Sequence, residues 1–124
     1  MSVVEGNLED YNELIMNDLV IVDFYATWCG PCKMLSPILE ELASEREEIS
    51  IVKIDVDKNQ ELSKSNGIMS VPTLIMFSKG ELLAKTSGYM TKDNLITWID
   101  ENRRAWHQAF LFLLKKLYFS SVLL

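Results

Sequence analysis

Runs of apolar residues separated by polar turns divide the chain into alternating strands and helices. Residues 19–26 (LVIVDFYA) are apolar with hardly any alternation, which predicts a strand buried on both faces. Residues 31–47 place apolar side chains on one side at helical spacing and glutamates on the other, which predicts an amphipathic helix. Residues 49–56 predict a second strand. The first half of the chain is therefore expected to contain a strand–helix–strand unit.

Shorter patterns surround this unit. They predict a helix at residues 7–16 capped by Asn7, a helix at 59–65, a hairpin of strands 73–77 and 82–87, and a last helix from Thr91. Alternating strands and helices favour a central mixed β-sheet with helices on both faces. We therefore expect one α/β domain over residues 1–104, followed by an apolar extension at 105–124.

Composition excludes several classes of protein. The 124 residues include 18 Asp and Glu against 12 Lys and Arg, and the net charge of −6 gives no nucleic-acid footprint. Two cysteines are too few for a disulfide-rich scaffold, and one histidine, His107, excludes a histidine-cluster metal centre. The first eighteen residues contain no Lys or Arg, so a secretory signal is not expected. We expect a cytoplasmic protein.

Two cysteines, Cys29 and Cys32, stand three apart between the buried strand and the first long helix. The first turn of a helix offers unpaired N–H groups and the positive end of the helix dipole, which stabilise a thiolate and lower its pKa. Pro31 suits this helix start because its missing N–H costs nothing there. The spacing thus indicates reversible dithiol–disulfide chemistry, and a structural disulfide or half of a metal knuckle is the less favoured interpretation.

The two sulfurs are expected to differ. Cys29 lies at the exposed strand–helix junction, whereas Cys32 lies one turn into the helix and is expected to point toward the core. We assign Cys29 as the attacking nucleophile and Cys32 as the thiol that resolves the mixed disulfide.

Asp23 is a carboxylate inside a buried strand, where it is costly unless paired or protonated. Burial is expected to raise its pKa, which suits a group that accepts the Cys32 proton through water. Lys53 in the next strand is the candidate counter-charge, and a purely structural Asp–Lys pair remains an alternative. Pro72, within Val71-Pro72-Thr73 at the start of a strand, indicates a bend or a cis peptide, although an ordinary strand-entry proline fits it as well.

Taken together, residues 22–33 (VDFYATWCGPCK), the later Val71-Pro72-Thr73, and Phe77, Gly80 and Gly88 resemble the thioredoxin family over residues 3–104. The resemblance implies a thioredoxin fold, with Cys29 and Cys32 as the redox pair and Asp23 and Lys53 as a buried proton-transfer pair. It further implies that Pro72 is a cis-proline facing the disulfide. It implies a flat apolar docking surface formed by Trp28, Gly30, Pro31, Val71, Gly88, Ile68 and Met69.

The resemblance also implies an activity. A Gly-Pro dipeptide between the cysteines goes, in this family, with reduction of disulfides in substrate proteins and with recharging by an NADPH-dependent thioredoxin reductase. A glutaredoxin-like activity is disfavoured by the same dipeptide. The resemblance further implies that the site needs no metal or organic cofactor. The alternative is an interaction module with the same fold that binds partners through its docking surface independently of redox state.

Residues 105–124 (AWHQAFLFLLKKLYFSSVLL) extend past the family pattern. No Gly or Pro ends the last helix at 104, so we expect it to continue to about Tyr118. The extension is apolar nearly all round: one stripe at helical spacing consists of Trp106, Phe110, Leu113, Leu114 and Leu117, and Leu111, Phe112 and Phe119 lie on the other side. An apolar surface of this kind has to be buried. Self-association into a homo-oligomer is the favoured interpretation; folding back on the domain or an end without function comes next, and a peripheral membrane anchor is the least favoured.

Overall fold

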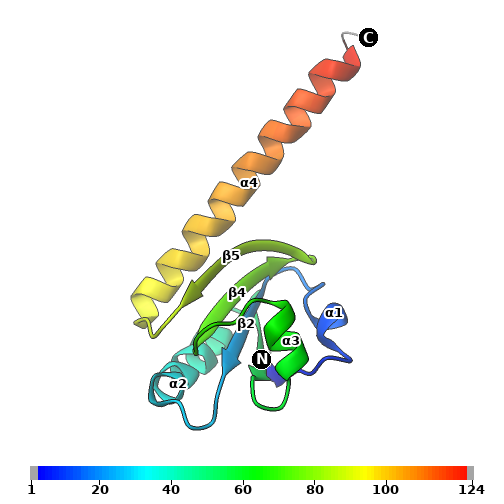
Figure 1. Cartoon of the computed structure of the whole chain (residues 1–124). Coiled ribbons are helices and arrows are strands. Elements are labelled where there is room, and N and C mark those ends of the chain that lie inside the picture. The colour runs from blue at the N-terminus through cyan, green and yellow to red at the C-terminus, as the bar shows by residue number, and fades with distance from the viewer. Residues whose placement is uncertain (1–2, 123–124) are drawn as a thin grey trace.

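A computed structural model describes residues 3–122 and shows a five-stranded mixed sheet flanked by helices (Figure 1). In chain order, the elements are β1 (Val3–Glu5), α1 (Tyr11–Leu14), β2 (Val20–Tyr25), α2 (Gly30–Glu45), β3 (Ser50–Asp55), α3 (Gln60–Ser65), β4 (Thr73–Ser78), β5 (Glu81–Ser87) and α4 (Lys92–Val122). The expected α/β class with a central mixed sheet is confirmed.

The sheet has the order β1-β3-β2-β4-β5. β3 pairs in parallel with β1 and β2, whereas β4 pairs antiparallel with β2 and β5. β2 is therefore central and has neighbours on both sides, which explains why its residues are apolar on both faces. At its end the chain turns directly into α2, and this strand–helix junction holds the two cysteines.

Successive side chains of the three central strands, β2, β3 and β4, alternate between two core clusters, one on each face of the sheet. Ile21, Ile51 and Leu74 pack with residues of α2 and α4 on one face. Val22 and Phe24 pack with Tyr11 of α1 and Leu62 of α3 on the other. The three layers predicted from the sequence are thus present, with α2 and α4 sharing one side.

Two differences from the sequence-based expectations lie in the N-terminal segment. The edge strand β1 was not predicted, because three residues are too short to show an alternation. The helix expected over residues 7–16 is reduced to Tyr11–Leu14. Asn7 does not cap this helix, and its side-chain oxygen instead accepts hydrogen bonds from the backbone N–H groups of Glu9 and Asp10, at 2.9 and 3.1 Å, in the preceding turn.

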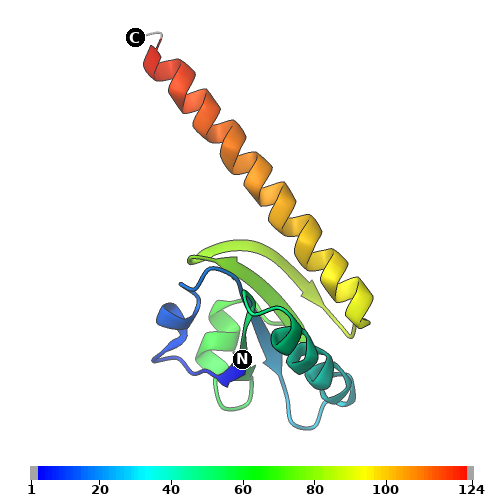
Figure 2. The same ribbon diagram turned by 180° about the vertical axis from the view of Figure 1, so that it is seen from behind.

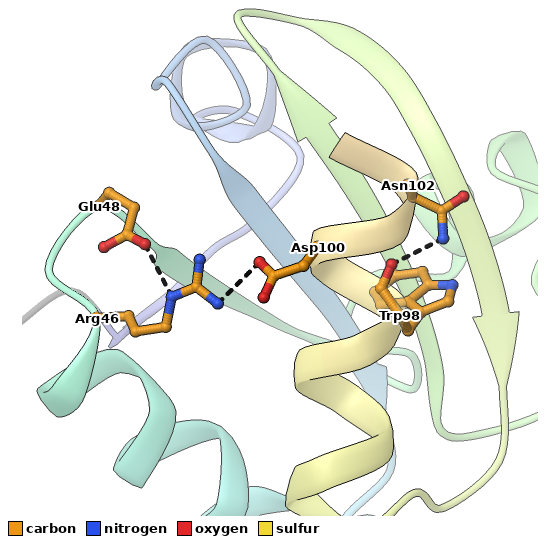
Figure 3. Close-up of polar contacts among 5 residues, drawn as sticks. All are labelled: Arg46, Glu48, Trp98, Asp100 and Asn102. Carbon is orange, nitrogen blue, oxygen red and sulfur yellow. Dashed lines mark hydrogen bonds and ion pairs between the residues drawn. The ribbon is translucent and has the colours of Figure 1, made fainter. Parts of the chain in front are cut away.

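The last helix, α4, is anchored to the domain at its beginning. Leu95 and Ile99 are fully buried against the sheet. Arg46, which ends α2, donates to Asp100 at 3.0 Å and to Glu48 at 2.8 Å, and Asn102 donates to the carbonyl of Trp98 at 2.8 Å (Figure 3). These contacts fix the direction in which α4 leaves the sheet.

Beyond this anchor α4 continues without a break to Val122 and projects away from the domain as one straight helix (Figures 1 and 2). Residues 107–122 are all exposed. The interpretation that this extension folds back on its own domain is therefore wrong. Nothing in residues 92–122 breaks the helix, because this segment contains neither Gly nor Pro. No helix in the described part of the chain is long and apolar enough to cross a membrane.

Candidate active site

Cys29 and Cys32 form a disulfide at the start of α2, with their Cα atoms 5.3 Å apart. Cys29 is the N-cap residue of the helix and its sulfur accepts a hydrogen bond from the backbone N–H of Cys32 at 3.2 Å. Pro31 occupies the first turn, where no donor is lost. An N–H group and the positive end of a sixteen-residue helix thus both act on the Cys29 sulfur, an environment that favours a thiolate.

The two cysteines differ less in exposure than the sequence led us to expect. Cys29 is 5% and Cys32 is 3% exposed, so both sulfurs are largely shielded in the disulfide form. What distinguishes them is position: Cys29 caps the helix and its sulfur lies 3.7 Å from the Val71 carbonyl oxygen, whereas Cys32 belongs to the helix itself.

Asp23 lies in the middle of β2 and is 1% exposed. Within the described residues, neither of its carboxylate oxygens has a hydrogen-bond partner. Burial raises the pKa of this carboxyl to about 7, against the opposing effect of the Lys53 charge, and Glu5 adds to the increase. Asp23 is therefore a group that exchanges a proton near neutral pH.

Lys53 is the residue of β3 that pairs with Asp23 in the sheet register. Its ammonium donates to the Ser36 hydroxyl at 2.6 Å and lies 4.8 Å from the centre of the Tyr25 ring. No direct hydrogen bond joins it to Asp23 in the described part of the chain. The expected Asp23–Lys53 pair is thus a pair of neighbouring residues whose charged groups do not touch; the ammonium instead donates to Ser36 and lies over the Tyr25 ring.

Tyr25 connects this cluster to the edge strand β1. Its hydroxyl donates to the Glu5 carboxylate at 2.6 Å. Burial and the nearby Glu5 carboxylate raise the pKa of Tyr25 above its usual range. Sequence reasoning singled out neither Glu5 nor Ser36, since a glutamate near the N-terminus and a serine inside a helix carry no distinctive spacing; only the sheet order and the packing of α2 show their place.

Val71 and Pro72 lie beside the disulfide, and the peptide bond between them is cis. The Pro72 carbonyl accepts the N–H of Gly88 at 2.8 Å, and Gly88 has φ of +95°, a conformation that glycine adopts readily. The hydroxyl of Thr73 donates to the Ser70 carbonyl at 2.7 Å. These hydrogen bonds hold the loop before β4 to the end of β5.

A cavity of about 240 Å³ lies at this end of the molecule and is lined by Trp28, Val56, Ser63, Ile68, Met69, Ser70 and Val71. Four residues named from the sequence, Trp28, Ile68, Met69 and Val71, thus share one concave surface. Gly30, Pro31 and Gly88 lie outside this lining. The indole N–H of Trp28 donates to Asp57 at 2.9 Å, a contact that sequence reasoning missed. Across the described residues no cluster of side chains is suited to a metal ion.

Comparison with known proteins agrees with this geometry. The family model for thioredoxin matches residues 2–101. A thioredoxin of Staphylococcus haemolyticus is 42% identical over 103 residues, covering 82% of this chain and 99% of that protein. A thioredoxin of Staphylococcus aureus strain Mu50 is 41% identical over the same length and coverage.

Among solved structures, a single-substitution mutant of a thioredoxin from Halobacterium salinarum NRC-1 superposes with a TM-score of 0.76 at 37% identity, covering 82% of this chain and 90% of that one. Both comparisons leave about a fifth of this chain unmatched. The disulfide at a helix start agrees with the family model and with the relatives, and the chain belongs to the thioredoxin family of disulfide oxidoreductases.

Proposed function

We propose that this protein-disulfide reductase works through Cys29 as nucleophile and Cys32 as resolving thiol. The Cys29 thiolate attacks one sulfur of a substrate disulfide, and the other substrate sulfur leaves as a thiolate that takes up a proton. Cys32 then loses its proton and attacks the Cys29 sulfur, which releases the second substrate thiolate and closes the Cys29–Cys32 bond. Two electrons pass to the substrate. The hydrogen bond from the Cys32 N–H to the Cys29 sulfur carries this assignment.

We assign to Asp23 the proton that Cys32 must lose. A carboxyl without a partner and with a pKa of about 7 is close to balance between its two forms at neutral pH, which is where a general base is most effective. Lys53 limits the increase in that pKa through its nearby charge. Water is the proposed carrier between the two groups.

Substrate binding is proposed at the surface around the disulfide. The Val71 carbonyl oxygen, 3.7 Å from the Cys29 sulfur, can accept a backbone hydrogen bond from an extended substrate segment. Trp28 and Met69, which are 69% and 94% exposed, offer apolar contacts beside the cavity. Pro72 shapes this edge, and Gly30, Pro31, Ile68 and Gly88 complete the proposed surface.

The oxidised protein has to be reduced again after each cycle. We propose an NADPH-dependent thioredoxin reductase as the partner that does so, and the cytoplasm as the place of action. Roles in electron transport and cell redox homeostasis follow from the same proposal. Self-association through residues 105–124 also stays a prediction.

Two cysteine variants test the assignment of roles. Cys29→Ser is expected to abolish reduction of insulin in an assay coupled to thioredoxin reductase and NADPH. Cys32→Ser is expected to accumulate mixed disulfides that dithiothreitol releases. Trapping by Cys29→Ser instead would reverse the two roles, and an inactive wild type would refute the reductase.

The alternative of a redox-independent interaction module makes the opposite prediction for the double variant Cys29→Ser/Cys32→Ser. Such a module would keep its full effect on a partner without either sulfur. The buried Asp23 carboxyl, which has no hydrogen-bond partner among the described residues, favours the reductase. Such a carboxyl destabilises the fold, and binding through a docking surface does not require it.

A further inference from the structure

One face of α4 continues from the core of the domain into solvent. Ile96, Ile99, Arg103, Trp106, Phe110, Leu113 and Leu117 follow one another at alternating spacings of three and four, so they lie on the same side of the helix. Ile96 and Ile99 pack against the sheet. The second half of the same face, Trp106, Phe110, Leu113 and Leu117, extends past the sheet; we call these four residues the α4 seam.

The exposed area on this part of α4 is large for a chain of this size. Nine large apolar side chains are between 44% and 69% exposed: Phe110, Leu111, Phe112, Leu113, Leu114, Leu117, Tyr118, Phe119 and Val122. If the full accessible area of one large side chain is roughly 200 Å², these nine side chains together expose on the order of 1,000 Å². A symmetrical contact that covers half of this area in each of two copies removes roughly 1,000 Å² in total, the size at which specific interfaces begin.

Two cavities of about 350 and 440 Å³ lie beside α4 and share Trp106 as a lining residue. We call the two cavities together the α4 groove; Phe110 and Leu113 of the seam line the outer one. The outer cavity is lined by Glu81 of the β4–β5 hairpin and by Trp106, Ala109, Phe110 and Leu113 of α4. Figure 1 shows α4 and this hairpin diverging toward the C-terminus of the helix.

Charge selects the occupant of the groove. Residues 1–104 carry 10 basic and 18 acidic side chains, a net −8, whereas residues 105–124 carry only Lys115 and Lys116, a net +2. An apolar helix with two lysines complements the outer cavity, where Glu81 is the one charged residue among the described residues of the lining. The inner cavity is lined by Asp100 but also by Arg103 and Arg104, so its charge does not favour a lysine. Because α4 is one straight helix, the chain cannot place its own Lys115 and Lys116 in its own groove. Another copy of the chain can.

We propose that two copies associate as an antiparallel pair through the α4 seam. The register that matches apolar residues throughout places Trp106 opposite Leu117 and Phe110 opposite Leu113, each twice by symmetry. Helical side chains lean toward the N-terminus of their own helix, so in this register the Lys116 ammonium of one copy reaches the level of Ala109 in the other. Ala109 shares its cavity with Glu81. A parallel pair would instead place two domains of net −8 and two lysine pairs side by side, which costs energy.

The first test compares two matched charge insertions by sedimentation equilibrium. The wild type is expected at twice 14.2 kDa at micromolar concentration. Leu113→Glu, on the seam, is expected to raise the dissociation constant at least about a hundredfold, corresponding to roughly 2.7 kcal/mol. Phe112→Glu, on the opposite side of the helix, is expected to leave it within about threefold of wild type. The proposal is overturned if the wild type is a monomer, or if both variants raise the dissociation constant of the dimer equally.

The second test addresses the groove. Glu81→Lys and Lys116→Glu are each expected to weaken the dimer about tenfold, and the double variant to recover most of the loss, because the swap restores opposite charges. Absence of recovery refutes the seating of Lys116 beside Glu81. Vesicles of phosphatidylserine and phosphatidylcholine that bind a monomeric wild type would assign the seam to a membrane surface and overturn the proposal. The dimer does not rest on the reductase function, so Leu113→Glu is expected to reduce insulin at the wild-type rate per chain.

Discussion

Replacing Asp23 with asparagine removes a buried ionisable group and keeps the size of the side chain. In the folded protein the pKa of Asp23 is about 7, against 3.8 for a free carboxyl, chiefly because burial disfavours the charge. The folded state therefore holds this proton to a higher pH than the unfolded chain does. As pH rises from about 4 through about 7, the unfolded chain gains stability from ionisation that the folded state lacks, and the free energy of unfolding falls.

The size of this loss follows from the two pKa values. A difference between 3.8 and about 7 corresponds to about 4 kcal/mol once both states are ionised. About 2.5 kcal/mol of it develops between pH 5 and pH 7.5. Asp23→Asn cannot ionise at this position and does not undergo this loss. Between pH 5 and pH 7.5, its free energy of unfolding is therefore expected to rise by about 2.5 kcal/mol relative to that of the wild type.

Urea unfolding of the oxidised proteins, followed by tryptophan fluorescence at pH 5 and pH 7.5, measures this difference. Comparing the two proteins cancels the titration of the other carboxylates. Both are measured at one chain concentration, because self-association makes apparent stability depend on concentration. If the gap between Asp23→Asn and wild type is the same at both pH values, the raised pKa is wrong, and with it the role of Asp23 as a base near neutrality.

Two further substitutions test contacts that no sequence motif announces. Ser36→Ala removes the acceptor of the Lys53 ammonium, which then approaches Asp23 and lowers the pKa of that carboxyl. The midpoint of the pH–rate profile for insulin reduction is therefore expected to move to lower pH. Ser36→Thr keeps the hydroxyl and serves as the control, and an unchanged profile in the alanine variant would contradict this role. Gly6→Ala brings a Cβ to 2.8 Å from Val52 Cγ1, where the chain after β1 packs on β3. Thermal unfolding is expected to show that the free energy of unfolding falls by about 1–3 kcal/mol. An unchanged melting temperature would show that the neighbouring side chains move aside without cost.

The centre of the fold could be predicted because burial leaves a clear pattern in the sequence. β2 is apolar on both faces, and the amphipathic stripe of α2 shows which side of the helix it buries. The edge strand β1 left no pattern, since an exposed strand of three residues needs neither alternation nor apolar side chains. The same limit explains the shortened helix α1, where Asn7 satisfies a turn instead of a helix end.

The pairing of the two cysteines and the burial of Asp23 could be predicted from the sequence, whereas the contacts around them could not. Cys29, Cys32 and Asp23 are conspicuous because their chemistry is unusual where they stand. The hydrogen-bond partner of Lys53 could not be predicted, because pairing across a sheet specifies which residues are neighbours but does not fix the direction of a long side chain. Packing of α2 on the sheet brings Ser36 to the ammonium, and the carboxyl of Asp23 is left without a partner.

The position of α4 keeps the proposed assembly and the redox site apart. The loop between β2 and α2, which carries Cys29, lies at the end of the domain away from the point where α4 leaves it (Figures 1 and 2). In an antiparallel pair the two domains lie at opposite ends of the joined helices, and each disulfide faces away from the contact. Substrate proteins can then reach both sites at once, and dimer formation should leave the rate per chain unchanged. Self-association would therefore add size and bury the apolar α4 seam without competing with disulfide exchange.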